Sequence, residues 1–296
     1  MKILKKYILI FYLFSTVIGH INAQTADNTS IVFDQFFQNY FLVNPASRDS
    51  LDKLRVSIGN RTLTGLFEGV NRIYADGSLK VNHQSSERFS RIGVLLMNNR
   101  DGEFINRTRA YARYSWTTGL GPRSSLSAGL ALGIVNYSAQ ASQAGGGSSS
   151  FSFDGNLGIW YLRKKLGIGL SYQQINPRVS RLVNPRIPLT PYYNLNFYYT
   201  AELSYSIDLT THLYLKYNAF DSNYLNAEVA PIFLFNKKFE TGVNYRHRRG
   251  LALLIGVKAI SIGKGAVRFM ASYLLSTRNL TSSADNVLEF SVGYSF

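Results

Sequence analysis

Three histidines after residue 23, His83, His212 and His247, are the side chains that could support acid–base or nucleophilic chemistry. Ester hydrolysis would need a nucleophile, an imidazole base and a group that orients the imidazole. None of the three histidines lies beside a nucleophile elbow, and the sequence has no zinc-protease, phosphate-loop or calcium-loop motif. We therefore predict a protein that is not an enzyme, has no cofactor or metal, and uses each histidine as an ordinary polar residue at a strand end.

A second candidate for chemistry is a strip of arginines, Arg107, Arg109 and Arg113. Successive side chains of a β-strand point to opposite faces, so these three share one face. If that face lines a lumen, the strip can attract anions. The alternative is structural, because paired charges commonly fill barrel interiors. The carboxylates considered as partners are Glu202, Glu228 and Glu240.

The elements that must position these residues are strands with one apolar and one polar face. Residues 287–296 alternate in this way and end on a phenylalanine, and 123–137, 165–174 and 192–207 repeat the pattern. Many of the runs are longer than the five or six residues usual in a soluble sandwich. They reach the roughly nine to eleven residues that a strand needs to cross a membrane.

The predicted fold class is therefore all-β: a transmembrane antiparallel β-barrel of about 14 strands, with an N-terminal plug or cap segment. The strands are expected near 52–63, 68–82, 88–98, 103–117, 123–137, 151–163, 165–174, 192–207, 211–220, 224–235, 238–247, 251–260, 266–276 and 287–296.

Residues 1–23 have the pattern of a secretory signal peptide, with lysines before an apolar stretch and Ala23 at the expected cleavage site. Cleavage removes three of 32 basic side chains and leaves 29 against 17 acidic ones, a formal charge of +12. The chain has no cysteine, which excludes a lipoprotein and a disulfide framework. The expected location is the outer membrane of a Gram-negative bacterium. Outer-membrane lipid is an expected partner, and nucleic acid is not.

Between the signal peptide and the barrel, residues 24–51 are too apolar for a free linker and lack the alternation of a strand. Because the interior of a barrel of this size is wider than its wall side chains can fill, we expect this segment to be a plug or a periplasmic cap. Its candidate contact residues are Phe36, Tyr40, Asn44 and Pro45. The barrel itself should span 52–296.

Bacterial barrels have short periplasmic turns and longer external loops. Counting back from a periplasmic C-terminus places the long connections 138–150 and 175–191 outside. The second is rich in proline and carries Arg178, Arg181 and Arg186, which can bind a partner or simply be solvated. Arg246, Arg248 and Arg249 are expected at another external turn.

Residues Phe33 to Ala46 read FDQFFQNYFLVNPA. The segment resembles the opening of the PorP/SprF family, outer-membrane proteins of the Bacteroidetes type IX secretion system. That family begins with an aspartate, a Gln-Phe-Ser-Gln-Tyr-like stretch and then Asn-Pro-Ala-Tyr. Residues 92–99 and 126–137 resemble its glycine-rich strands, whereas Ser47-Arg48-Asp49 replaces its usual Tyr-Ala-Gly.

The resemblance implies a fourteen-stranded barrel similar to fatty-acid transporters. Its implied role is to assist the secretion or surface attachment of cargo proteins with a C-terminal sorting domain, such as gliding adhesins, together with other components of the secretion system. It supplies no catalytic residues. The alternative function is an outer-membrane channel or transporter for small hydrophobic or anionic solutes, which the inward arginines and the plug-like segment would suit.

Overall fold

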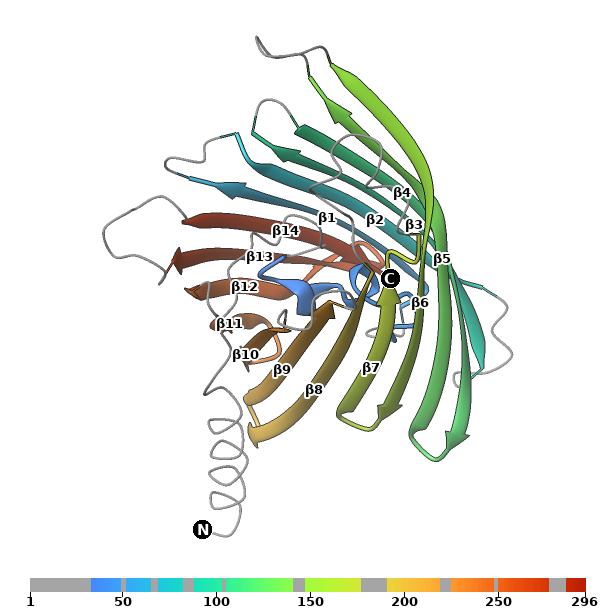
Figure 1. Ribbon diagram of the computed structural model, residues 1–296. Helices are drawn as coiled ribbons and strands as arrows, with labels where there is room; N and C mark the ends of the chain where they lie inside the picture. Colours follow the sequence, from blue (N-terminus) through green and yellow to red (C-terminus); the bar gives the residue numbers. More distant parts are fainter. Residues whose placement is uncertain are drawn as a thin grey trace.

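The computed structural model describes residues 33–48, 52–64, 69–81, 88–102, 105–140, 147–176, 191–218, 225–247, 250–276 and 286–296. Within these residues fourteen antiparallel strands form one closed barrel (Figure 1). They are β1 (Leu54–Leu63), β2 (Asn71–Val81), β3 (Phe89–Asp101), β4 (Ile105–Gly121), β5 (Ser124–Ala139), β6 (Ser148–Arg163), β7 (Leu166–Gln173), β8 (Tyr192–Ser204), β9 (Ile207–Asn218), β10 (Leu225–Phe235), β11 (Phe239–Arg246), β12 (Gly250–Ile262), β13 (Gly265–Ser276) and β14 (Val287–Ser295). The predicted fold class is confirmed.

The C-terminal strand closes the barrel. β14 pairs with β1 from Arg55–Ser295 to Leu63–Val287, and on its other edge it pairs with β13. Each strand also pairs with its neighbour in sequence, so every described strand is paired along both edges. Closure satisfies the backbone hydrogen bonds that hydrocarbon cannot satisfy, which is why a sheet can span a membrane only as a barrel.

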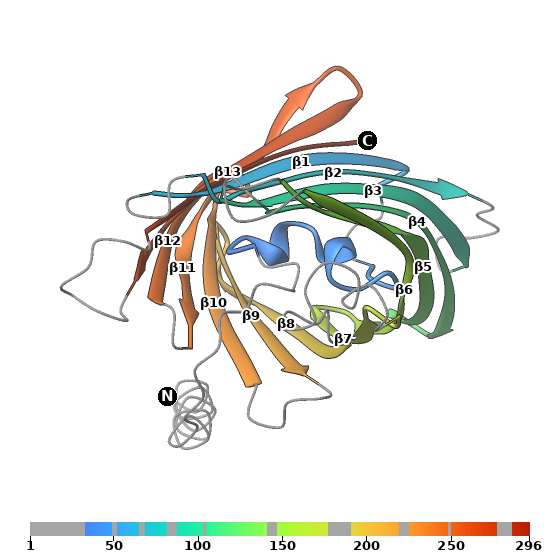
Figure 2. The ribbon, with the colours of Figure 1, turned by 45° about the horizontal axis from the view of Figure 1, so that its top comes forward.

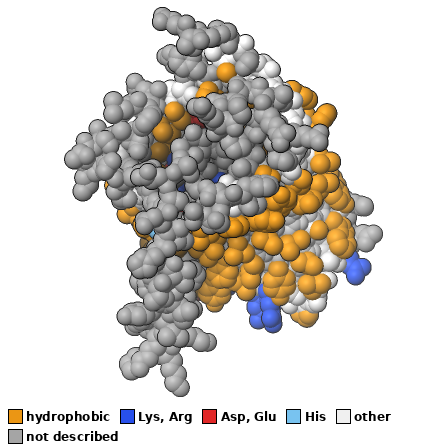
Figure 3. Space-filling model, viewed as in Figure 1, with side chains coloured by type: hydrophobic (Ala, Val, Ile, Leu, Met, Phe, Trp, Pro, Cys, Tyr) orange, Lys and Arg blue, Asp and Glu red, His pale blue; other side chains and the backbone are white. Residues whose placement is uncertain are grey.

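The wall is apolar outside and polar inside. On β14, Phe290 and Val292 are 39% and 47% exposed, whereas Glu289 and Ser291 are 1% and 7% exposed. On the face seen in Figure 3, apolar side chains form a band across the described surface. The alternation recognised in the sequence therefore corresponds to a lipid face and a lumen face.

Five short turns lie at one end of the barrel, at 122–123, 164–165, 205–206, 236–238 and 263–264. By the general rule for bacterial barrels this end is periplasmic; the β4–β5, β6–β7 and β8–β9 turns are seen at the bottom of Figure 1. The β8–β9 turn comes earlier than the expected 208–210. The reason is that apolar alternation continues through Tyr205, which is fully exposed at the turn, into the next strand.

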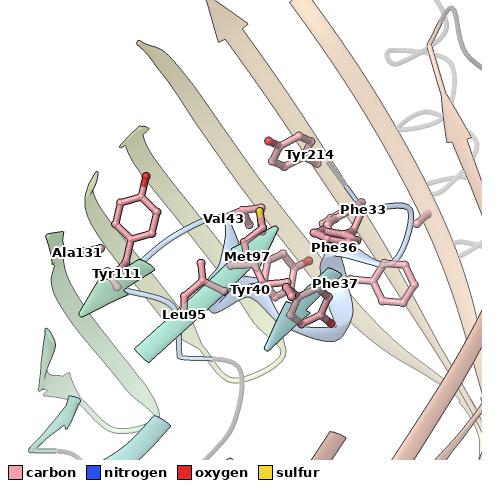
Figure 4. Packing of buried hydrophobic residues seen from close by; sticks show 14 of the residues in the cluster. Phe33, Phe36, Phe37, Tyr40, Val43, Leu95, Met97, Tyr111, Ala131 and Tyr214 are labelled. Carbon is pink, nitrogen blue, oxygen red and sulfur yellow. The ribbon is translucent and has the colours of Figure 1, made fainter. Parts of the chain in front are cut away.

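Inside the barrel lie two short 3₁₀ helices, η1 (Phe36–Gln38) and η2 (Tyr40–Leu42). Figure 2 shows this part of the chain within the ring of strands. The main buried apolar cluster is formed by these helices and by inward side chains of the wall (Figure 4). Among the described residues, no helix is both long and apolar enough to cross a membrane.

Candidate functional site

The candidate site is the segment from Phe33 to Arg48, called here the lumen segment. Its fold is local: the Asn39 side chain accepts a hydrogen bond from the Phe41 backbone N–H at 3.1 Å, and the Asn44 side chain accepts one from Ala46 N–H at 2.9 Å. Such Asn-to-backbone bonds stabilise turns in place of regular secondary structure. Residues 33–47 are all buried, which is unusual for an irregular segment and requires the wall to satisfy its remaining polar groups.

At its N-terminal end the lumen segment is held by buried charges, called here the charge cluster. The Glu289 carboxylate on β14 accepts hydrogen bonds from the backbone N–H groups of Asp34 and Gln35 at 2.8 and 2.9 Å. Arg246 on β11 contacts Asp34 and lies 2.9 Å from Glu228 on β10. Arg61 on β1 lies 3.6 Å from both Asp34 and Glu289. Three strands, β1, β11 and β14, therefore contact Asp34, and β10 is joined to them through Arg246.

Arg246 was expected at an external turn, and that expectation is wrong. It ends β11 on the inward face, is 2% exposed, and pairs across the sheet with Glu228. Successive side chains of a strand point to opposite faces. An error of one residue in the assumed strand position is therefore enough to turn Arg246 from the outside to the lumen. The companion residues 248 and 249 lie outside the described part of the chain.

In the middle of the lumen segment, amide side chains and aromatic rings face different walls. The Asn39 amide donates hydrogen bonds to Ser57 Oγ at 3.0 Å and Asp76 Oδ1 at 2.9 Å. The Gln38 amide donates one to Glu240 at 3.2 Å. Polar contacts of this kind satisfy groups that would otherwise be buried without a partner.

The aromatic side of the lumen segment surrounds His212. The Tyr40 hydroxyl lies 2.6 Å from His212 Nδ1, and the Phe37 ring stacks on the imidazole with centroids 4.8 Å apart. Tyr40 also packs against Trp160 and Tyr198. The expectation that His212 is a terminal strand residue is wrong, because it lies inside β9 with only 9% of its surface exposed. Its ring contacts are those of a packing residue.

The Asn-Pro-Ala portion rests on the inner faces of β5, β6 and β7. The Asn44 amide donates to the backbone carbonyls of Ile159 and Leu170 at 3.1 and 3.2 Å, and Asn44 is fully buried. Gly129 and Gly158 allow this approach, because a Cβ atom at either would collide with Pro45 or with Asn44. The absence of a side chain on the wall is what lets the segment backbone lie against it.

The carbonyl of Val43 adds a third anchor. It accepts hydrogen bonds from Ser171 Oγ and Gln173 Nε2, both at 2.8 Å, and from Asn194 Nδ2 at 3.2 Å. All three donors are inward-facing residues of β7 or β8 that are at most 2% exposed. The lumen segment thus crosses the barrel from the β10–β14 side to the β5–β8 side. The contacts of Phe36, Tyr40, Asn44 and Pro45 are those of a segment that fills the lumen, although the domain boundary 24–51 itself stays a prediction.

The three arginines Arg107, Arg109 and Arg113 share the inward face of β4 and are at most 4% exposed. Arg107 pairs with Asp101, and Arg113 pairs with Asp76 and lies 3.7 Å from the centre of the Phe41 ring. Asp101 and Asp76, the partners of Arg107 and Arg113, were not among the carboxylates considered from the sequence. Glu202 is exposed and pairs with Lys165, Glu228 pairs with Arg246, and Glu240 contacts Gln38. An anion-attracting role for the strip stays a prediction.

Other predicted residues fall elsewhere. His247 follows β11 and donates its backbone N–H to Ala227 O at 2.9 Å. His83 and Arg178, Arg181 and Arg186, together with the signal peptide, lie outside the described residues. Within the described ranges, no cluster of three or more His, Cys, Asp or Glu residues could hold a metal ion.

The residues that sequence reasoning missed are Asp34, Glu289 and Gln173. Glu289 did carry a signal, because it is a carboxylate on the lumen face of the terminal strand. Its partners could not be inferred, since Asp34 and Glu289 are 255 positions apart in the chain.

Comparison with solved structures shows outer-membrane channels of the same fold. CymD, a monoaromatic hydrocarbon channel, has a TM-score of 0.54 and 14% identity, over 92% of this chain and 95% of that one. The Pseudomonas putida toluene transporter TodX has a TM-score of 0.52 and 11% identity, over 87% and 93%. A Pseudomonas aeruginosa FadL homologue has a TM-score of 0.50 and 8% identity, over 86% and 92%. At these identities the likeness establishes the fold alone.

Comparison with curated proteins gave no match. A family model, in contrast, matches residues 25–294, which is nearly the whole chain and includes the lumen segment and, except for the last residue of β14, all fourteen described strands. The match agrees with the resemblance noted for residues 33–46. The chain belongs to the PorP/SprF family of type IX secretion system membrane proteins.

Proposed function

We propose that this barrel is a non-enzymatic outer-membrane component of type IX secretion that assists the export or surface attachment of particular cargo proteins with a C-terminal sorting domain, such as gliding adhesins. The observation that carries the proposal is the family match over residues 25–294. Removal of the signal peptide near Ala23 would deliver the chain to the outer membrane.

The packed lumen supports a role at the surface of the barrel. The lumen segment crosses the interior and is bonded to wall residues on opposite sides, such as Glu289 and Asn194. A cargo protein that passed through the lumen would have to displace this segment and break these contacts. Cargo would therefore be handled by the external loops or by neighbouring secretion components, and not be threaded through this barrel.

The loop that contains Arg178, Arg181 and Arg186 is our candidate for partner binding. Arginine suits such a site because its planar group pairs with carboxylates in a fixed geometry. Replacing all three by serine should reduce recovery of the cargo or of another secretion component with the tagged barrel. Arg100→Ser, at an exposed position of β3, is the matched control and should change nothing.

The decisive experiment is deletion of the gene, followed by quantitative proteomics of the cell surface and the medium. At least one sorting-domain protein should leave the surface fraction, and the wild-type gene should restore it. The proposal is wrong if every such protein is exported and retained normally.

The second candidate function is a channel for small hydrophobic or anionic solutes. It is favoured by the fold shared with monoaromatic hydrocarbon channels and by the inward arginines Arg107, Arg109 and Arg113. Planar-bilayer conductance of the purified chain, or solute uptake that is lost on deletion, would support it. A barrel that neither conducts nor takes up solute, but whose deletion displaces cargo, would exclude it.

A further inference from the structure

Basic side chains gather at the periplasmic turns of β4–β5 and β6–β7. Arg123, Arg163 and Lys164 are all exposed there, and Lys and Arg side chains stand out at the lower edge of the apolar band in Figure 3. The Lys164 N–H donates a hydrogen bond to the Arg123 carbonyl at 2.9 Å, so the two turns lie side by side. Three positive charges therefore occupy one short stretch of the barrel rim.

The backbone at two of these positions disfavours the residue that is present. Arg123 has φ 62° and Lys164 has φ 53°, in the left-handed region where glycine or asparagine is the usual choice. Lys237 in the β10–β11 turn has φ 59° as well, so this backbone geometry does not by itself indicate a function. What needs an explanation is the gathering of three cations in two adjacent turns.

Neighbouring acids do not supply that explanation. In the part of the chain that the structure describes, the ion pairs do not include Arg123, Arg163 or Lys164. The adjacent Lys165 is the residue that pairs with Glu202. The three cations can therefore pair with an anion that comes from outside the chain.

The position of Arg163 indicates which anion. By strand alternation it lies on the lipid side of β6, in line with Ile159, which is 52% exposed, and with Tyr161. A long basic side chain at the end of an apolar face typically extends to the headgroup level of the bilayer. Because both turns are short, Arg123 and Lys164 are held at the same height and cannot reach far into the periplasm.

We propose that Arg123, Arg163 and Lys164 form a binding site for the phosphate of an anionic phospholipid in the periplasmic leaflet, with the acyl chains lying along the outer faces of β4 to β6. The site would fix the height and rotation of the barrel at this edge. An acidic protein partner is less suitable, because a protein interface needs a broad raised surface and these turns end at the membrane boundary.

The chain contains its own reporter for this site. Of its two tryptophans, Trp116 on β4 is 49% exposed on the lipid face, whereas Trp160 is fully buried in the lumen. Trp116 pairs with Ala128, which pairs in turn with Ile159 on the strand that ends at Arg163. Brominated acyl chains quench tryptophan only at short range, so quenching of the full-length barrel in vesicles measures lipid bound beside Trp116.

The experiment compares brominated phosphatidylglycerol with brominated phosphatidylcholine. Phosphatidylglycerol should quench more strongly at equal mole fraction, and added salt should reduce its advantage. In Arg123→Gly/Lys164→Gly the preference should fall by roughly 25-fold, because each of the two removed cations contributes about fivefold near an anionic surface. Glycine suits both left-handed positions, so this variant should fold at least as well as the parent.

Two variants serve as controls. Lys237→Gly makes the same change at a residue with φ 59° in the β10–β11 turn, far around the barrel from Trp116, and should leave the preference unchanged. Lys164→Arg keeps the charge and should also keep the preference. Equal quenching by the two lipids, or a preference that survives Arg123→Gly/Lys164→Gly, would overturn the proposal. Loss of a co-purifying acidic protein without any lipid preference would assign the cations to a protein partner and overturn it as well.

Discussion

Replacing Arg246 by methionine should release the lumen segment from the wall. In the folded protein Arg246 is 2% exposed and bridges Asp34 of the segment to Glu228 of β10. Methionine fills similar space without charge. Asp34 and Glu228 would then lose the guanidinium that joins them.

The size of the effect follows from the burial of the pair. Removing one partner of a buried ion pair destabilises a structure by about 3 to 5 kcal/mol, because the other charge is left without compensation. The lumen segment can detach from the wall while the barrel stays folded. Most of this loss of free energy should therefore appear as a shift in the equilibrium between the packed and the detached segment. It should shift by roughly one hundredfold to a few thousandfold, at about 1.4 kcal/mol for each factor of ten.

The assay uses the absence of cysteine from the chain. A single Phe33→Cys substitution places a thiol beside Asp34, at a position that is 3% exposed in the folded barrel. The rate of maleimide labelling then reports opening, with the urea-unfolded protein as the unprotected reference. Arg100→Met is the control, since it is the same chemical change at an exposed site. Equal labelling rates in the parent and in Arg246→Met, with the barrel folded in both, would refute the reasoning.

Two further changes test the rest of the site. Gly158→Ala should also raise labelling, because its Cβ would collide with Asn44, whereas Gly77→Ala should not, because nothing lies within 4 Å of a Cβ there. The hydrogen bond between Tyr40 and His212 should contribute about 0.5 to 1.5 kcal/mol. A double-mutant cycle of Tyr40→Phe and His212→Phe, followed by urea unfolding, measures that coupling, and a value near zero would mean that the 2.6 Å contact has no energetic role.

The barrel itself could be predicted from the sequence because the evidence for it is local. A strand repeats every two residues, so stretches such as 123–137 reveal a lipid face without knowledge of their neighbours. Short turns and long connections then fix which end of each strand is periplasmic. The β8–β9 turn was misplaced because Tyr205 continues the apolar alternation and no residue type there marks the end of the strand.

The site depended on information that no local pattern contains. The sequence alone determined that residues 33–46 are too apolar for a linker and that the strands have polar inner faces. Only the tertiary structure decided that Glu289 binds the backbone of Asp34 and Gln35, that Arg246 faces the lumen, and that Gly158 lies beneath Asn44. The physical reason is strand register. Closure of the barrel places residues that are distant in the sequence at the same level of the wall, and a shift of one residue in a strand would turn its lumen-facing side chains to the lipid.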